Sequence, residues 1–185
     1  MSKFQNKILE SIKGKKVGVF CDDSNLYHSY QKYGWRVDFE KFGKLLKEIC
    51  DLQFINYYVA VPEKSDFSRA GTERFFKHIE PFVILKKKLL KYLPVASTVL
   101  KKGDVDVEIV IDVVRNIDKL DVIIVLSGDS DLCELKNYVI RDKGKNIIFW
   151  AFEKNMAWEL KYCWHLYLDD YKDEFLKKFD MERFK

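Results

Sequence analysis

Two short apolar runs, at residues 16–21 and 122–126, restrict the fold more than any other feature of the sequence. A continuous apolar run of this length is expected for a parallel strand that is covered on both faces. The other apolar runs are separated by segments whose apolar residues recur at helical spacing. This alternation predicts a three-layer α/β fold, in which helices flank a central, mainly parallel sheet and the crossovers are right-handed.

The individual elements follow from this pattern. We expect strands at residues 16–21, 54–61, 82–85, 122–126 and 146–152. We expect helices at residues 24–33, 38–50, 65–80, 104–116 and 129–142. Asp38 is a suitable N-cap, and Gly144 stands just past a predicted helix end, where glycine is favoured. Residues 86–100 are ambiguous between a short hairpin and a basic loop around Pro94.

The chain has 185 residues, a length that fits one domain. We assign residues 1–168 to this domain and residues 169–185 to a closing amphipathic helix, because Phe175, Leu176 and Phe179 recur at helical spacing. The helix is expected to pack on its own domain, and a homodimer contact is the alternative.

Features that would place the chain in a membrane or outside the cell are not found in the sequence. No run approaches the roughly 20 apolar residues that a membrane helix needs. The polar amino terminus lacks the apolar core and cleavage site of a signal peptide. The four cysteines are dispersed, which disfavours a zinc site or a disulfide framework. We therefore expect a cytoplasmic protein with no membrane partner.

Three groups of aspartates lie where predicted strands end or helices begin. Asp22 and Asp23 end the first strand, the sequence SGDSD at residues 127–131 follows the strand at 122–126, and Asp104 and Asp106 open a helix. Any one of these aspartates is more simply explained as a helix cap or as a partner of the helix dipole. Three groups at one edge favour a functional site, because ligands of open α/β sheets bind outside the carboxyl ends of the strands.

Crowded carboxylates of this kind indicate a bound cation. Two carboxylates about 4 Å apart repel by roughly 4 kcal/mol at an effective dielectric constant of about 20. Carboxylates and water suit Mg²⁺ or Mn²⁺, which often take substrate phosphates as further ligands. Residues 86–102 contain six lysines and no acid, a composition that favours polyanions. The combination indicates phosphodiester chemistry, and a solvated strand edge is the alternative explanation of the lysines.

Three ordered motifs carry a resemblance to a known family. They are VGVFCDDSNLYHS, KKGDVDVEIVIDVV and DVIIVLSGDSDL, and an apolar strand follows them. From Lys15 to Leu168 the sequence resembles the NYN domain, the LabA-like branch of the PIN-like nucleases. The resemblance implies a Rossmann-like PIN fold and metal-dependent nuclease activity, chiefly on RNA.

The resemblance also implies roles for individual residues. By position it assigns metal binding and catalysis to Asp22, Asp106, Asp129 and Asp131. It also matches Ser24, Asn25 and Asp112 to family positions. The sequence departs from the family at Asp23, where Gly is usual, at Leu132 for Phe, at Glu134 for Pro, and near Ala157, where Ser is expected. None of these departures removes an implied metal ligand.

We expect the four aspartates to be unequal. Asp22 and Asp129 are the anchors of the site, Asp106 is a further ligand, and Asp131 acts through water. Asp104 and Asp112 are expected to support these ligands by orienting them, and the alternative for Asp106 or Asp104 is a helix cap. A buried Asp112 needs a partner, because an unpaired carboxylate would be costly.

Other polar and aromatic residues have two readings each. Asn25 and Ser127 either orient carboxylates and phosphate or serve ordinary turn chemistry. We expect phosphate contacts from the lysines, first Lys101 and Lys102 and then Lys86, Lys87, Lys88 and Lys91. Four aromatic residues either stack unpaired bases or belong to the core: Tyr27, Tyr30, Tyr33 and Trp35.

Three functions are compatible with these residues. The first is a Mg²⁺- or Mn²⁺-dependent endoribonuclease acting on single-stranded or structured RNA. The second is a regulatory module that binds RNA or a protein with little turnover. The third is a DNA-directed nuclease or a phosphatase that uses the same acids. Dinucleotide and nucleoside triphosphate binding lose support, because the sequence has neither GxGxxG nor GxxxxGK[ST].

Overall fold

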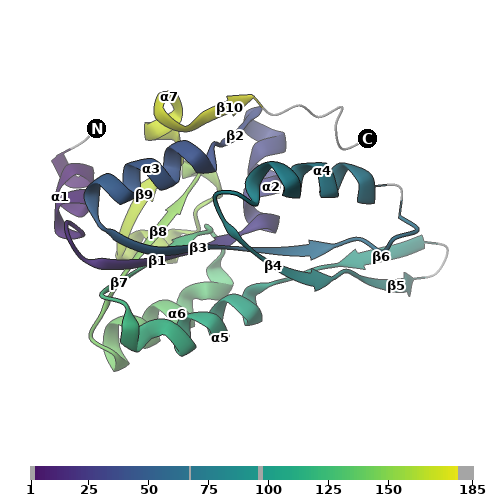
Figure 1. Cartoon of the computed structure of the whole chain (residues 1–185). Helices are drawn as coiled ribbons and strands as arrows, with labels where there is room; N and C mark the ends of the chain where they lie inside the picture. The colour runs from purple at the N-terminus through teal and green to yellow at the C-terminus, as the bar shows by residue number, and fades with distance from the viewer. Residues whose placement is uncertain (1–2, 67, 96–97, 179–185) are drawn as a thin grey trace.

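The computed structural model describes residues 3–66, 68–95 and 98–178, and within them six parallel strands form the central sheet (Figure 1). The strand order is β4-β3-β1-β7-β8-β9, and every neighbouring pair is parallel. The strands are β1 (Lys16–Asp22), β3 (Asp51–Val61), β4 (Ile84–Leu89), β7 (Val122–Leu126), β8 (Asn146–Ala151) and β9 (Trp164–Tyr167). The predicted α/β fold with a parallel sheet is confirmed, although β9 was not predicted.

Helices cover both faces of this sheet, so the domain has three layers (Figure 1). One face carries α1 (Lys3–Ser11), α2 (Asp23–Tyr33), α3 (Phe39–Ile49), α4 (Arg69–Ile79) and α7 (Lys172–Phe175). The other face carries α5 (Asp106–Asn116) and α6 (Cys133–Asn137). Each face encloses its own core. Phe42 and Trp150 belong to the first core and Phe20 and Phe149 to the second, and all four are fully buried.

The two apolar runs are the central strands of the sheet. All five residues of β7 are buried, as are all residues of β1 after Lys16. Full burial of a large apolar side chain contributes about 1.5–3 kcal/mol, so these strands hold both helical layers to the sheet.

No helix in the described part of the chain is both long and apolar enough to cross a membrane.

Local sequence signals set several helix ends. Asp38 caps α3 as predicted, because its carboxylate accepts hydrogen bonds from the backbone N–H groups of Glu40 and Lys41. Gly144 has a φ of 61°, the left-handed conformation expected just past a helix. The predicted helix at 129–142 is corrected to three consecutive turns, namely a 3-10 turn at Ser130–Leu132, α6, and a π-helical turn at Tyr138–Asp142. The bond from Lys143 N to Tyr138 O gives the last turn its wider spacing.

The ambiguous lysine-rich segment forms an extended hairpin. β4 continues through the first lysines to Leu89, and β5 (Lys91–Val95) then pairs antiparallel with β6 (Thr98–Lys102). Figure 1 shows this hairpin reaching beyond the end of the sheet. The hairpin reading is therefore correct, and Pro94 lies within a strand of it.

The predicted closing helix at 169–185 is corrected over the residues that the structure describes. A 3-10 turn at Leu168–Tyr171 leads into the four-residue α7, and β10 (Leu176–Lys178) follows and pairs antiparallel with β2 (Trp35–Val37). Tyr171 and Phe175 are buried against Trp150, and β10 satisfies the edge of β2. Tertiary pairing thus overrides the helical pattern, and Phe179 lies outside the described residues.

Candidate active site

The strand order reverses direction between β1 and β7. From β1 the chain moves outward to β3 and β4, whereas from β7 it moves the other way to β8 and β9. Ligands of such sheets bind at this reversal, outside the carboxyl ends of the strands. Asp22 is the last residue of β1, and Ser127 directly follows β7. Two of the three predicted acidic groups therefore flank the reversal.

Asp22 is the most buried acid at this edge, with 1% of its surface exposed. Its Oδ1 accepts hydrogen bonds from Ser24 Oγ at 2.8 Å and from the backbone N–H of Asn25 at 3.2 Å. Its Oδ2 accepts a hydrogen bond from Ser127 Oγ at 2.9 Å. Burial raises the pKa of this carboxyl, and so does the nearby Asp129 carboxylate, whereas the three hydrogen bonds lower it. Asp22 is thus held in one orientation from both strand ends.

The SGDSD loop is tied to the first strand end by side-chain hydrogen bonds. The backbone N–H of Gly128 donates to Asn25 Oδ1 at 3.0 Å, and that of Asp129 donates to Ser127 Oγ at 3.2 Å. The Oδ1 of Asp129 accepts from the backbone N–H of Asp131 at 3.0 Å. These contacts place Asn25 and Ser127 where orienting groups are needed, and they fix the start of the turn that carries Asp129.

Gly128 allows a third loop to approach the site. The N–H of Ala157 donates to Gly128 O at 2.9 Å, and a Cβ on Gly128 would lie 2.8 Å from the Cα of Met156. Asn155 Nδ2 donates in turn to Ser29 Oγ at 2.6 Å on α2. The loop after β8 therefore packs against the acid loop and α2. Asn155 could not be predicted from the sequence, because an asparagine in a turn carries no distinctive signal.

Asp106, the first residue of α5, joins the same charge cluster. Its pKa is raised to about 6, first by burial and then by the carboxylates of Asp22, Asp129 and Asp131. The four predicted acids are thus near enough to act on one another electrostatically. Asp106 is half-buried, and Asp131 is exposed.

The carboxylates of this edge suit an open cation site. Among the residues that the structure describes, no group of three or more His, Cys, Asp or Glu side chains is arranged to hold a metal ion. Mg²⁺ usually keeps several waters and takes only one or two protein carboxylates together with substrate phosphates. The oriented Asp22 and the adjacent Asp129 therefore fit an open, water-rich site and do not form a closed cage.

A cavity of about 510 Å³ adjoins the acids on the β3 side. Asp23 and Ser24 line it from α2, and Asp104 and Val105 line it from the segment before α5. Asp23 accepts a hydrogen bond from the hydroxyl of Tyr57. Its pKa is raised to about 7, chiefly by burial and also by Asp22, and the Tyr57 bond opposes this rise. Asp23 stands where the family usually has glycine, and it thus adds an acid between the site and this cavity.

Two predicted supporting acids are engaged elsewhere. Asp112 accepts a hydrogen bond from the Tyr58 hydroxyl at 2.9 Å and pairs with Lys86 Nζ at 3.3 Å and with Arg115 at 3.6 Å. Asp104 is exposed and pairs with Lys102 Nζ at 3.2 Å. The structure therefore does not bring Asp112 to the acid cluster, and its contacts supply the partner that a carboxylate in an apolar helix needs.

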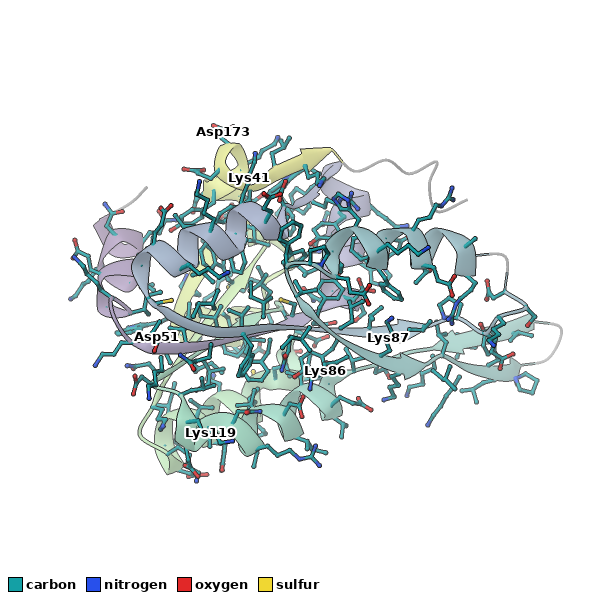
Figure 2. The ribbon with its side chains drawn as sticks, in the orientation of Figure 1. Lys41, Asp51, Lys86, Lys87, Lys119 and Asp173 are labelled. Atoms are coloured by element: carbon teal, nitrogen blue, oxygen red, sulfur yellow. The ribbon has the colours of Figure 1, made fainter. Side chains whose placement is uncertain are left out.

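Four of the predicted phosphate-binding lysines are paired with acids, namely Lys86, Lys87, Lys88 and Lys102. Figure 2 shows Lys86 and Lys87 on β4, with Lys86 directed toward α5. Lys88 Nζ lies 2.7 Å from Glu108 and donates to the backbone oxygen of Asp104 at 2.8 Å. The side chain of Lys101 lies outside the described part of the structure. Exposed ion pairs of this kind contribute only about 0–1 kcal/mol, so phosphate can compete for the lysines.

The four predicted aromatic residues divide between the core and the cavity on the β3 side. Tyr30 and Trp35 are buried in the first core. Tyr33 stacks on Phe152 with ring centroids 4.6 Å apart. Tyr27 lines the cavity beside the acids. The core reading is therefore right for most of them.

The variant Asp112→Asn tests whether Asp112 belongs to the active site. The amide oxygen can still accept from Tyr58, whereas the pairs with Lys86 and Arg115 are lost. We expect the free energy of unfolding to fall by no more than about 1 kcal/mol, because both cations are exposed. Any activity that depends on the acid cluster should be unchanged. A large loss of that activity without a loss of stability would show that Asp112 acts together with the cluster.

Comparison with known proteins gives the family and the fold of the chain. The chain is 24% identical over 157 residues to the low amplitude and bright protein LabA of Synechococcus elongatus, and the match covers 83% of each chain. A crystal structure of a protein of unknown function from Vibrio parahaemolyticus has the same fold, with a TM-score of 0.69, 22% identity and coverage of 96% of this chain and 99% of that one. The NYN domain matches residues 16–169, which include every acid of the site. The chain belongs to the NYN domain family.

Proposed function

We propose that the protein is a metal-dependent endoribonuclease that hydrolyses RNA phosphodiester bonds at the Asp22–Asp129 site with Mg²⁺ or Mn²⁺. The observation that carries the proposal is the buried Asp22 carboxylate, held by three hydrogen bonds beside Asp129 at the topological reversal of an NYN domain. Asp22 is also the N-cap of α2, through the hydrogen bond from the Asn25 N–H, but a cap alone needs no second hydrogen bond from the other strand end. An oriented carboxylate facing a second acid is what an open divalent-cation site requires.

Each residue has a defined task in this proposal. A bound divalent cation would polarise the phosphate and lower the pKa of a bound water. Asp22 and Asp129 would hold the cation, Asp106 would complete the acidic wall, and Asp131 would act through water. Ser24, Asn25 and Ser127 keep these carboxylates in place. In the hydrolysis a water oxygen bonds to phosphorus, one ester P–O bond breaks, and the leaving oxygen takes up a proton.

The lysine-rich hairpin supports a polyanionic substrate. Lys86, Lys88 and Lys102 are paired with acids of α5 and its preceding segment, and these pairs are exposed enough to exchange for phosphate. Lys101 is proposed to join them. RNA would lie along the hairpin and reach the acids from there. The lysines would neutralise its phosphates on that side of the acids.

A second candidate function is a regulatory module that binds RNA or a protein with little turnover. The exposed lysines of the hairpin and of β4 would serve such a module without turnover at the acids.

We also propose that the protein is cytoplasmic, a location supported by its four free cysteine thiols.

A parallel assay separates these functions. The purified protein would be incubated with single-stranded RNA, single-stranded DNA and a small phosphate ester, each with Mg²⁺, Mn²⁺ or EDTA. We expect the protein to cut RNA into internal fragments. We expect EDTA to abolish this cleavage. RNA binding without metal-dependent cleavage would favour the regulatory module. Preferential cleavage of DNA or of the ester would replace RNA as the substrate.

A further inference from the structure

Two exposed aromatic side chains stand beside the acid site and are not used by the proposed chemistry. Trp158 is 64% exposed and Tyr162 is 79% exposed. Their ring centroids are 5.4 Å apart, and the rings meet edge to face at 84°. Single exposed apolar residues are common at protein surfaces, but two neighbouring exposed aromatic rings form a patch that can contact a ligand. We call this pair the aromatic platform.

The short helix that carries the platform packs next to the acid loop. Both residues belong to a 3-10 helix at Trp158–Tyr162, and Leu160 in its middle is fully buried in the second core. Ala157, the residue before Trp158, donates its N–H to the oxygen of Gly128, the residue before Asp129. The start of the platform is therefore one residue away from a direct backbone contact with the acid loop.

We propose that the aromatic platform stacks an unpaired base of single-stranded RNA next to the phosphate held at the acids. This inference rests on the proposed function, and it adds that the substrate must be single-stranded at this position. Every base has a π-face, so stacking on aromatic rings holds RNA without a need for a particular sequence. A base within a duplex is stacked on its neighbours and cannot reach the platform.

The place of the pair favours RNA over a protein partner, because its helix begins at the backbone contact with the acid loop. The segment itself is not basic. Glu153 and Glu159 offset Lys154 and Lys161, and Lys161 Nζ lies over the Tyr167 ring, 5.6 Å from its centroid. The rings would therefore take the base, and the hairpin lysines would take the charge of the phosphates. The hairpin lysines lie on the β4 side of the acids and the platform lies on the β8 side. A single strand could therefore be held on both sides of the cleaved bond.

Tryptophan fluorescence gives a direct test in the Asp129→Asn background, where bound RNA is not consumed. Of the four tryptophans, Trp35 and Trp150 are buried and Trp164 is partly buried, so Trp158 is the one a ligand can cover most fully. Titration with a single-stranded adenine oligoribonucleotide should quench the emission in a saturable way. Trp158→Phe should abolish this quenching while the affinity, measured by fluorescence anisotropy of labelled RNA, stays close to that of the parent.

Alanine substitutions measure the contribution of the platform. Trp158→Ala and Tyr162→Ala should each weaken binding of the single strand about 5- to 150-fold, the range expected for one stacked base. Phe82→Ala is the matched control, since Phe82 is also exposed (37%) but precedes β4 at the opposite edge of the sheet. It should leave the affinity unchanged. Binding of an RNA duplex should be equally insensitive to all three substitutions.

The outcomes separate this inference from the proposed function. Equal affinity of the parent, Trp158→Ala and Tyr162→Ala for the single strand, or quenching that persists in Trp158→Phe, would overturn the platform even if the wild-type protein cuts RNA. Lost affinity in both alanine variants, with no cleavage by the wild-type protein, would support the platform and contradict the nuclease.

Discussion

Asp129→Asn is expected to lower the rate of the proposed metal-dependent RNA cleavage by at least about 100-fold, because one proposed oxygen ligand of the cation would lose its charge. The variant should still fold. The amide oxygen of asparagine can accept the hydrogen bond that Asp129 Oδ1 now accepts from the backbone of Asp131. The loss of one charge also relieves the repulsion that Asp129 exerts on Asp22 and Asp106. The free energy of unfolding without metal should therefore be unchanged or slightly higher.

Asp38→Asn is the matched control for this variant. Asp38 is likewise an N-cap aspartate whose oxygen accepts backbone hydrogen bonds at the start of a helix, and it follows β2, outside the acid cluster. Initial rates on a labelled single-stranded RNA and thermal unfolding would be measured for both variants. The control should cut at the wild-type rate. If Asp129→Asn also cut at that rate, the assignment of the site would be wrong.

Gly128→Ala is expected to destabilise the domain by about 1–3 kcal/mol, which lowers the unfolding temperature by roughly 2–12 °C. The added Cβ would meet backbone atoms of Asn155 and Met156, which cannot rotate away as a flexible side chain could. The loop after β8 must then move, and it carries the hydrogen bond from Ala157 to Gly128. Cleavage should fall as well, because the same shift displaces Asp129.

Gly43→Ala separates this effect from a general cost of replacing a buried glycine. Gly43 lies inside α3, and a Cβ there would be 3.4 Å from the Cδ1 of Ile55, an ordinary contact distance. Alanine favours the helix over glycine by about 0.5–1 kcal/mol, so this variant should be at least as stable as wild type. Equal unfolding temperatures for the two alanine variants would show that Gly128 is not needed for close packing.

The burial of the central strands could be predicted from the sequence because a continuous apolar run has one stable position in an α/β protein. β1 and β7 lie where their composition requires, in the middle of the sheet. Helix caps at Asp38 and the turn at Gly144 were also predictable, since they depend on a few neighbouring residues. The closing helix was not, because the pairing of β10 with β2 joins segments far apart in the chain.

The candidate site divides in the same way. The sequence by itself determined that acids end two buried parallel strands, and the ends of such strands share one edge of the sheet. Only the tertiary structure decided that β1 and β7 are neighbours, so that Ser127 can reach Asp22, and that Asp112 faces Lys86 and not the other acids. It also decided that Trp158 and Tyr162 are exposed beside the acid loop. The physical reason is that local pattern fixes which side chains can be buried, whereas the meeting of distant side chains depends on strand order and loop packing.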